Sequence, residues 1–546
     1  MSNSPLLEAS IPAMVLASAR RFASEEAIVD GDRRWSYADL GKTVVESVRA
    51  AVALGVEPGD RVGLWAPNSA EWILAALGVL GAGGILVPLN TRWKAEEVAY
   101  ALDRAGASTL FVAQGFLGHD HIGALRAVAP TPPALGRIVT LDGDAPDTLP
   151  WAEYLRAGDA VDQAEALARV AAVRPEDTSD IMFTSGTTGQ PKGVMLNHQA
   201  SLRAFVWLTD VFTFRRGDRY LVVPPFFHTF GYKAGWMASF ARGVTVLPQR
   251  VFDAADVLAR IERERVSILL GPPTLFTDMM HHPRRHEHDL SSLRVTVPAA
   301  AGVPVELVHR LREDLGFEVV ITSYGLTEAH SLVSTCRPDD APEDVARSVG
   351  RAADGIEVRV VDDDGMPCPP GERGEVLVRG YVVMSGYWQD PQATREAIDA
   401  DGWLHTGDVG VLDERGFLSI VDRKKDMVIV GGFNVYPAEI ERVILQQPGV
   451  AEAAVVAAPD SRLGEVPVAF VVPRPGHTVA AEPLLAALRD RLANTKVPRR
   501  LHVVDELPRN ASMKVLKTRL RELAAETHPR PPRPSGDDTV PPGGEQ

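Results

Sequence analysis

The sequence predicts an α/β protein with a large N-terminal domain of parallel-sheet α/β subdomains plus a small β unit, and a small α+β domain at the C-terminal end. Helical and strand patterns alternate from residue 36 to residue 322, which is typical of parallel sheets with helices on their faces. From Gly350 onward, short strands separated by turns replace this alternation. A run of five charged residues, 422–426, then precedes a second mixed segment. We therefore place the domains at 1–424 and 425–526.

The N-terminal pattern begins with a helix that Ser36 opens and that runs through Val48. The stretch 72–89 has no charged residue and is just long enough to span a membrane, but glycines and Pro88 interrupt it near its end. We therefore predict a buried helix, a turn and a buried strand there, and no transmembrane segment. Further helices are expected at 91–107, 254–264 and 304–315, and strands at 61–65, 109–112, 194–196, 267–270, 294–297 and 318–322. The stretch 218–225 is expected to form a strand and a turn.

The same periodic patterns predict the strands and helices of the C-terminal part of the chain. Strands are expected at 357–361, 374–378 and 416–421 in the β unit, and at 453–457 and 466–472 in the C-terminal domain, with helices at 438–445 and 482–492. The charged run 422–426 is either a solvated turn or a hinge. Residues 527–546 carry six prolines and three glycines, so we expect a disordered tail.

The composition excludes several classes of protein. A chain of 546 residues is too long for one core. The net charge of -15 argues against a general nucleic-acid binder, which needs a concentrated basic surface. Its two cysteines, Cys336 and Cys368, are too few for a disulfide framework and predict reduced thiols in the cytoplasm. We predict no signal peptide, because Glu8 precedes the apolar stretch 11–19 and Pro12 interrupts it.

The stretch 183–193, FTSGTTGQPKG, has the composition of a polyphosphate-binding loop. Its glycines let backbone N–H groups approach an anion, its hydroxyls add donors, and Lys192 adds a positive charge. A flexible linker would need neither the buried run 181–183 before it nor the Pro191 exit. The loop is not a Walker A motif, because Gly193 rather than Ser or Thr follows the lysine and a strand comes next. We expect a hairpin-borne phosphate loop.

This loop resembles the signature loop of the adenylate-forming superfamily, which contains acyl-CoA synthetases, luciferases and adenylation domains of peptide synthetases. Four further motifs in the expected order extend the resemblance from about Trp35 to Leu523. They are YGLTE at 324–328, DGWLHTGD at 401–408, DRKKDMVIVGGFNVYPAEIE at 422–441 and PRNASMK at 508–514. The resemblance implies a mobile C-terminal domain and a requirement for ATP, Mg²⁺ and coenzyme A. It also implies an acyl-adenylate intermediate.

The resemblance assigns roles to residues of the N-terminal domain. Thr184, Ser185, Thr188 and Lys192 would hold the β and γ phosphates of ATP, and Glu328 would bind Mg²⁺. Thr327 would contact the α-phosphate, and Tyr324 would lie against adenine. Without the other motifs, Thr327 and Glu328 would be read as a helix-initiating turn and Tyr324 as a core residue. The remaining nucleotide-binding candidates are Gly186, Thr187, Gly189, Ala301, Gly302 and Gly325.

Further roles fall near the domain boundary and beyond it. Asp408 would accept both ribose hydroxyls with support from Arg423, although each alone would be read as a surface residue. Lys514 would reach the carboxylate and the α-phosphate during adenylation; the usual glycine before it is replaced by Met513. Domain rotation would pivot at Lys425, and the glycines of the third motif would line the pantetheine tunnel. These are Gly431 and Gly432.

The acid-binding segment indicates a hydrophobic acid rather than an amino acid, because no aspartate lies near His228 to hold an amine. His228 either shapes the acid pocket or is a satisfied structural histidine. Lys233 either extends to the pocket rim, which is the plainer interpretation, or offers its ammonium to a substrate keto group or to a coenzyme A phosphate. The other expected lining residues are Phe230, Tyr232, Trp236, Ser323 and the segment 299–302, which begins with Ala299 where glycine is usual.

Within the superfamily, FFHTFGYKAG, GPPTLFTDMMHHP and STCRPDD resemble actinobacterial ligases that activate the bicyclic indane-dione propanoate of steroid-ring degradation. A medium- or long-chain fatty acyl-CoA ligase is the alternative. A fatty acyl-AMP ligase that loads a carrier protein and a non-catalytic nucleotide binder are two further hypotheses. A small carboxylic acid is the expected partner, no nucleic acid is expected, and a homodimer stays open. The irregular spacing of the histidines at 281–288 favours a solvated loop over a metal site.

The role of Lys514 gives a direct test. Lys514→Ala is expected to lower the rate of acyl-adenylate formation by about 10²- to 10³-fold, as for the loss of one transition-state donor. Thioester formation from supplied acyl-adenylate should largely survive. An equal loss in both half-reactions would contradict domain alternation.

Overall fold

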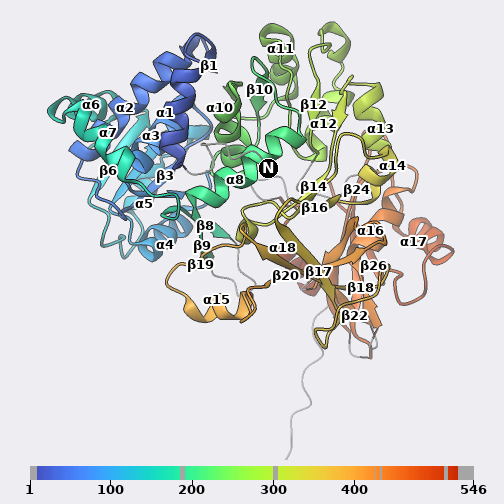
Figure 1. Ribbon diagram of the computed structural model, residues 1–546. Coiled ribbons are helices and arrows are strands. Elements are labelled where there is room, and N and C mark those ends of the chain that lie inside the picture. Colours follow the sequence, from blue (N-terminus) through green and yellow to red (C-terminus); the bar gives the residue numbers. More distant parts are fainter. Residues whose placement is uncertain are drawn as a thin grey trace, which may run out of the picture. The chain divides into compact units, whose positions relative to one another are not determined.

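The computed structural model describes residues 9–184, 191–298, 305–424, 426–430, 433–460, 462–509 and 515–526 (Figure 1). The chain divides into two compact units, Met1–Ile420 and Val421–Gln546. This division lies near the predicted domain boundary after residue 424, which stays a prediction. Each unit has its own core.

The first sheet of the larger unit has eight strands in the order β19-β9-β8-β4-β3-β5-β6-β7. They are β3 (Arg61–Trp65), β4 (Ile85–Pro88), β5 (Thr109–Ala113), β6 (Arg137–Asp142), β7 (Leu149–Pro150), β8 (Thr178–Thr184), β9 (Lys192–Asn197) and β19 (Gly386–Tyr387). The pairs from β7 to β8 are parallel, and β9 is antiparallel to both β8 and β19. The parallel part confirms the prediction from helix–strand alternation.

Helices from the N-terminal third of the chain lie around this sheet, in blue and cyan in Figure 1. They are α2 (Tyr37–Ala53), α3 (Ala70–Gly81), α4 (Ala95–Ala105), α5 (His121–Arg126), α6 (Trp151–Ala157) and α7 (Gln163–Ala172), with short helices η2 (Phe116–Gly118) and η3 (Gly158–Ala160). The Ser36 hydroxyl accepts a hydrogen bond from the amide of Asp39 at 3.1 Å, and the Asp39 carboxylate accepts one from the Ser36 amide at 3.0 Å. This capping box explains why α2 begins where predicted.

Helix α4 begins four residues after the predicted start at residue 91. Asn90 accepts a hydrogen bond from the amide of Arg92 through its side chain, which forms a turn. Glu97 accepts one from the amide of Lys94 at 2.8 Å, which places the helix start after that residue. The stretch 72–89 forms most of α3, a turn and β4, as predicted. None of the helices in the described ranges is long and apolar enough to cross a membrane.

A second sheet of the larger unit has the strand order β10-β11-β1-β2. The strands are β1 (Glu26–Asp30), β2 (Arg33–Ser36), β10 (Arg219–Val222) and β11 (Thr245–Pro248). The predicted strand 267–270 is reduced to a bridge residue, Ile268, which pairs in parallel with Tyr220 and Val295. Through Val295 it reaches a short parallel pair, β12 (Val295–Thr296) and β13 (Val319–Val320).

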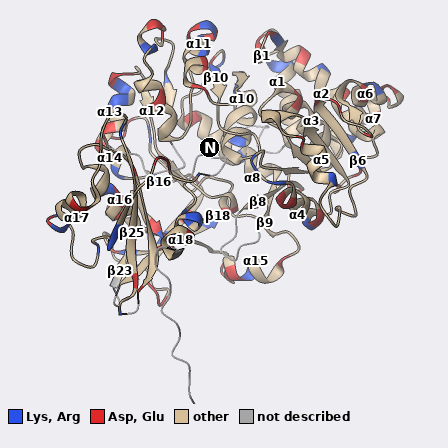
Figure 2. Ribbon diagram, turned by 180° about the vertical axis from the view of Figure 1, so that it is seen from behind, with Lys and Arg blue, Asp and Glu red and all other residues tan. Residues whose placement is uncertain are grey.

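The helices associated with this part of the unit are green to yellow-green in Figure 1, apart from the N-terminal α1. They are α1 (Ile11–Arg21), α8 (His198–Val211), α9 (Thr229–Gly231), the π-helix η4 (Tyr232–Met237), α10 (Ala238–Arg242), α11 (Ala254–Glu264), α12 (Pro273–His281), η5 (Arg285–Glu287) and α13 (Val305–Glu313). In Figure 2, both acidic and basic residues are seen on α11 and on α13.

Antiparallel strands follow, and those after Gly350 lie where the change of pattern predicts short strands. They are β14 (Ser323–Tyr324), β15 (Ser334–Thr335) and β16 (Arg351–Ala352) in one sheet, and β17 (Ile356–Val361), β18 (Arg373–Gly380), β20 (Leu404–Leu412) and β21 (Leu418–Arg423) in another. The helices of this region are η6 (Thr327–Ala329), α14 (Pro342–Arg347) and α15 (Pro391–Ala397).

The smaller unit is an α+β domain with its own core. Its sheet has the order β23-β22-β25-β24, with β26 parallel to β25. Its elements are β22 (Val428–Val430), β23 (Phe433–Val435), α16 (Pro437–Leu445), β24 (Val450–Asp460), β25 (Gly464–Pro473), α17 (Ala481–Arg489), β26 (Arg500–Val503) and α18 (Lys517–Glu526). Ile440 of α16 and Leu488 of α17 are fully buried in this core. The tail 527–546 lies outside the described residues.

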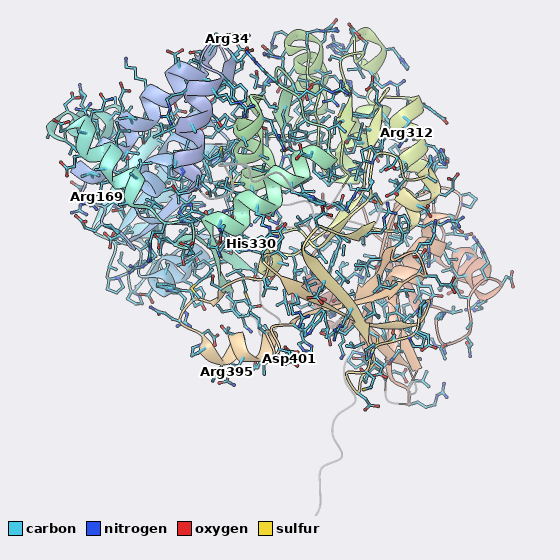
Figure 3. All side chains as sticks on the ribbon, viewed as in Figure 1. Arg34, Arg169, Arg312, His330, Arg395 and Asp401 are labelled. Carbon is cyan, nitrogen blue, oxygen red and sulfur yellow. The ribbon has the colours of Figure 1, made fainter. Side chains whose placement is uncertain are left out.

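Two histidines of the larger unit, His198 and His330, are each only 1% exposed. His198 begins α8, and His330 lies inside the molecule, whereas Arg169 and Arg395 lie at its periphery (Figure 3). Burial, and to a smaller extent the ammonium of Lys233, lowers the pKa of each imidazole to about 3. Both rings are therefore neutral at neutral pH.

This burial predicts acid sensitivity. The folded-state pKa of His198 lies below the unfolded value, so its contribution to stability is complete above about pH 6.5 and is lost as the pH falls toward 3. The free energy of unfolding should fall by about 1.4 kcal/mol per pH unit in this window. In His198→Asn, whose side-chain oxygen can still accept from the amide of Ile11, urea midpoints at pH 5.5 and 7.5 should differ less than in the wild type. The exposed His281→Asn should keep the wild-type difference; identical behaviour of the two variants would contradict the prediction.

Candidate active site

The two strands on either side of the predicted phosphate loop form a β-hairpin. Strands β8 and β9 pair antiparallel, and the last pair before the connection is Thr184 with Lys192. Gly193 allows this pairing to pack closely, because a Cβ there would lie 2.7 Å from Cγ2 of Ile181. The two strands confirm the hairpin, and the loop residues Ser185, Gly186, Thr187, Thr188 and Gly189 lie outside the described residues.

The mouth of this hairpin meets the carboxylate of Glu328. The Thr184 hydroxyl donates to Oε1 of Glu328 at 3.4 Å, and the Tyr387 hydroxyl donates to the same oxygen at 3.1 Å. The ammonium of Lys192 lies 5.0 Å from the centre of the Tyr387 ring. The structure therefore brings together three residues that the sequence predicts for phosphate and metal binding, and adds Tyr387.

Burial and the neighbouring carboxylate of Glu328 raise the pKa of Tyr387, so its hydroxyl stays protonated and donates. Tyr387 lies on β19, opposite Val194 of β9. The backbone also fixes Glu328, since the amide of Met384 donates to its carbonyl at 2.8 Å. Tyr387 was missed because its contact with Glu328 spans 59 positions of the chain.

A tight turn presents Glu328. Gly325 permits this turn, because a Cβ there would lie 2.1 Å from the carbonyl carbon of Ser331. His330 and Ser331 both have positive φ, at 47° and 58°. Thr327 begins η6, as the turn interpretation predicts. Gly325 therefore has a packing reason in the described structure, and its nucleotide contact stays a prediction.

The donor set fits a Mg²⁺ ion bound together with nucleotide. Mg²⁺ typically takes one or two carboxylates, waters and phosphate oxygens rather than an all-protein cage. Glu328 supplies such a carboxylate beside the Thr184 hydroxyl. In the described part of the chain, no group of three or more His, Cys, Asp or Glu side chains is placed so that it could hold a metal ion. The histidines at 281–288, which are described, form no such group either.

Two predicted nucleotide-binding residues meet at a second point of the same unit. The Tyr324 hydroxyl donates to Oδ2 of Asp408 at 2.5 Å. Asp408 is 3% exposed and lies on β20, where its amide donates to the Thr406 hydroxyl at 3.1 Å. Because Thr406 in turn donates to the carbonyl of Val376 at 2.7 Å, the Asp408 turn is fixed to β18.

The side chain of His228 hydrogen-bonds to the backbone two residues further along the chain. It caps α9, with Nδ1 accepting from the amide of Phe230 at 3.2 Å. The next residue, Thr229, shares a short hydrogen bond with the hydroxyl of Ser331, which joins this segment to the turn that presents Glu328. Phe230 is half-buried. Ser323 donates to the carbonyl of Ser334 at 3.1 Å. The pocket roles of these residues stay predictions.

Lys233 corrects a prediction. It does not extend to a pocket rim, because its side chain is 1% exposed and its ammonium forms an ion pair with Asp180. It is therefore not offered to a keto group or to a coenzyme A phosphate. Tyr232 and Trp236 are fully buried and stack with ring centres 4.7 Å apart in the core. Their place in an acyl site stays a prediction.

In the smaller unit, the charged run 422–426 is more structured than a solvated turn. Asp422 accepts from the amides of Arg423 at 2.7 Å and Ala438 at 2.9 Å, and burial raises its pKa. Asp426 forms an ion pair with Arg521. The ribose role of Arg423 stays a prediction. The other predicted residues of this region and of the segment 299–302 lie outside the described residues; they are Ala301, Gly302, Lys425, Gly431, Gly432 and Lys514.

Comparisons with known proteins agree with this arrangement. The AMP-binding enzyme family matches residues 15–388, and the C-terminal domain of AMP-binding enzymes matches residues 439–514. This chain belongs to the AMP-binding enzymes. Because named CoA ligases are among its relatives, the predicted class of AMP-forming acyl-CoA synthetase is confirmed.

Two bacterial relatives of this AMP-binding enzyme carry the name 3-[(3aS,4S,7aS)-7a-methyl-1,5-dioxo-octahydro-1H-inden-4-yl]propanoyl:CoA ligase. The protein of Rhodococcus jostii is 47% identical over 94% of this chain and 98% of its own length. The protein of Mycobacterium tuberculosis is 47% identical over 94% of this chain and 99% of its own. A solved anthranilate CoA ligase in complex with anthranoyl-AMP is 29% identical, with a TM-score of 0.86 over 95% of this chain and 98% of that one. These likenesses confirm the predicted family and fold class.

The contact between Tyr387 and Glu328 can be tested in this AMP-binding enzyme. Tyr387→Phe removes one hydrogen bond to a charged group and keeps the ring beside Lys192. The rate of acid-dependent pyrophosphate exchange with ATP should fall by about 10- to 100-fold, in line with about 1.5–3 kcal/mol for such a bond. Tyr381→Phe, whose ring lies against Arg203, is the matched control. Equal rates in both variants would rule out a role for the Tyr387 hydroxyl.

Proposed function

We propose that this acyl-CoA ligase activates a bicyclic, keto-substituted propanoate of the indane-dione class in two steps. The observation that carries the reaction class is the contact of Thr184 with Glu328 at the mouth of the phosphate hairpin. ATP and coenzyme A are the cosubstrates of the family's acyl-CoA ligases, and a small carboxylic acid is the partner.

The chemistry explains these residue types. In the first step, a carboxylate oxygen of the acid bonds to the α-phosphorus of ATP, and the bond to pyrophosphate breaks. Because negative charge builds on phosphate oxygens, hydroxyl and ammonium groups such as those of Thr184 and Lys192 stabilise the leaving group. In the second step, the thiolate of coenzyme A attacks the acyl carbon and AMP leaves. The thiol proton passes to solvent.

We further propose that Glu328 holds Mg²⁺ on the phosphates of ATP. The ion would neutralise charge on the pyrophosphate as it leaves. Support comes from the Glu328 carboxylate, which takes hydroxyl donors from both Thr184 and Tyr387 and is thus fixed before any ligand arrives. Tyr324 and Asp408 are proposed to bind the nucleoside. Their mutual hydrogen bond would be exchanged for bonds to the ribose.

The substrate proposal rests on similarity and on polarity. The two bacterial relatives named for the bicyclic propanoate match nearly the whole chain at 47% identity. A mitochondrial medium-chain acyl-CoA ligase of Macaca fascicularis is 33% identical over 95% of this chain and 87% of its own. Burial of Lys233 removes one cation from the candidate acid site. A substrate that has only neutral ketones apart from its carboxylate needs no such cation, so the bicyclic acid is compatible with this site.

A cytoplasmic location is also proposed. Support comes from the two cysteines, Cys336 and Cys368, which are both free. The homodimer stays a prediction.

A panel of acids tests the function. The protein would be mixed with MgATP, coenzyme A and either the dioxo-indanyl propanoate, decanoate, palmitate or ferulate, and both AMP and thioester would be measured. We expect kcat/KM for the bicyclic acid to exceed that for each other acid by at least about tenfold, a typical discrimination by pocket shape. Preference for a fatty acid would favour the alternative substrate. Acyl-adenylate without thioester would favour a carrier-loading ligase, and no AMP with any acid would contradict the proposed reaction.

A further inference from the structure

A buried ion pair lies at the base of the phosphate hairpin. Asp180 of β8 has no exposed side-chain surface, and Lys233 of η4 is 1% exposed. The Lys233 ammonium also donates to the hydroxyl of Ser201 at 3.0 Å and lies 3.5 Å from that of Ser179. The Ser179 hydroxyl donates to the same carboxylate oxygen of Asp180 at 2.5 Å. One ammonium on η4 therefore contacts groups from two other elements, β8 and α8.

These contacts join one arm of the hairpin to the helix that follows the other arm. Asp180 lies on β8, the arm that enters the loop, and Ser201 lies in the first turn of α8, which begins directly after β9. Side chains alternate along a strand, so Asp180 and Thr184 lie on the same face of β8, about 13 Å apart. Lys233 thus joins β8 to the first turn of α8 at the end of the hairpin opposite the loop, and Thr184 lies where β8 enters the loop.

The segment that carries Lys233 also reaches the other side of the site. Helix η4 follows directly on α9, which His228 caps. Thr229 of α9 hydrogen-bonds Ser331, three residues after Glu328. The segment 228–237 therefore contacts both the base of the hairpin and the turn that presents the Glu328 carboxylate. A displacement of either would change the distance between Thr184 and Glu328.

Stability alone does not explain this pair. Burying two charges costs several kcal/mol per ion before their attraction is counted, and apolar pairs of similar volume are often equally stable or more so. Within the described structure, Oδ1 of Asp180 is buried without a hydrogen-bond partner, which adds to the cost. A nucleophilic role is also unsuited, because the ammonium is inaccessible and engaged. What a buried pair can supply is a single fixed geometry.

We propose that Lys233 is a positioning residue for acyl-adenylate formation. Through Asp180 and Ser201 it fixes the phosphate hairpin relative to the segment that begins at His228. The inference rests on the proposed function. It predicts that weakening the clamp impairs the use of MgATP and leaves the second half-reaction intact.

Ser201→Ala provides the mildest test, and the chain offers a matched control. Ser201 and Ser239 are both buried helical serines whose hydroxyls donate to the carbonyl four residues earlier, at 2.8 and 2.7 Å. Ser201 also accepts from Lys233. In acid-dependent pyrophosphate exchange, Ser201→Ala should raise the KM for MgATP by about 3- to 10-fold with kcat within about twofold, in line with about 0.5–1.5 kcal/mol for one hydrogen bond. Ser239→Ala should match the wild type.

The double variant Asp180→Leu/Lys233→Met removes the clamp without leaving a lone buried charge. It should stay folded by thermal unfolding and lower kcat/KM for MgATP by at least about tenfold, while thioester formation from supplied acyl-adenylate stays within about twofold. Asp218→Leu/Arg294→Met, a second buried ion pair, controls for the general effect of such a replacement.

The outcomes separate the two proposals. If the wild type forms AMP but Ser201→Ala and the double variant behave like their controls, or if both half-reactions fall together, the positioning role is overturned and the proposed function stands. If the wild type forms no AMP with any acid, the proposed function itself fails. Should the double variant not fold, the comparison of Ser201→Ala with Ser239→Ala decides the inference.

Discussion

The antiparallel pairing of β8 with β9 is the constraint on which the candidate site depends. Its register sets Thr184 opposite Lys192 at the mouth of the connection, so a hydroxyl and an ammonium lie at the two ends of the phosphate loop. The described contacts of Glu328 are made beside this hairpin. Glu328 approaches it through the turn at Gly325, and Tyr387 reaches Glu328 from a strand that pairs with β9.

The polar contacts of this site form two groups, one partly exposed near the loop and one buried at the far end of the hairpin. Near the mouth of the hairpin, Thr184, Tyr387 and Glu328 form hydrogen bonds among partly exposed groups that a nucleotide and a cation can rearrange. At its base, Asp180 and Lys233 are enclosed by the core. The buried ion pair gives the hairpin a fixed position, and the partly exposed groups can rearrange around the ligand. Electrostatic catalysis of phosphoryl chemistry needs such fixed positions, because preorganised groups lose little energy in reorienting during the reaction.

Much of the fold could be predicted from the sequence, since local signals decide it. The Ser36 cap, the glycine-interrupted stretch 72–89 and the strand that follows Lys192 all formed as expected. The strand expected at 267–270 did not form as such, because its pairing is limited to bridges at Ile268. Pairing depends on distant partners, which a local pattern does not contain.

The residues of the site divide in the same way. Glu328, Thr184 and Lys192 were predictable because their motifs carry the chemistry of phosphate and metal binding. Lys233 was misread, because the apolar segment around it resembles the lining of a pocket as much as a core. A charged residue in the middle of a buried strand, Asp180, was the signal that a buried partner existed. No comparable sequence feature near Tyr387 indicated its contact with Glu328.

Binding of Mn²⁺ with ATP tests the central claim most directly, namely that the hairpin and Glu328 together hold the metal–nucleotide complex. Titration of MnATP followed by electron paramagnetic resonance would compare the wild type with Glu328→Gln. We expect the variant to bind MnATP at least about tenfold more weakly, and to bind metal-free ATP as well as the wild type does, because only a carboxylate supplies a strong hard ligand. Equal affinity of both proteins for MnATP would contradict the assignment.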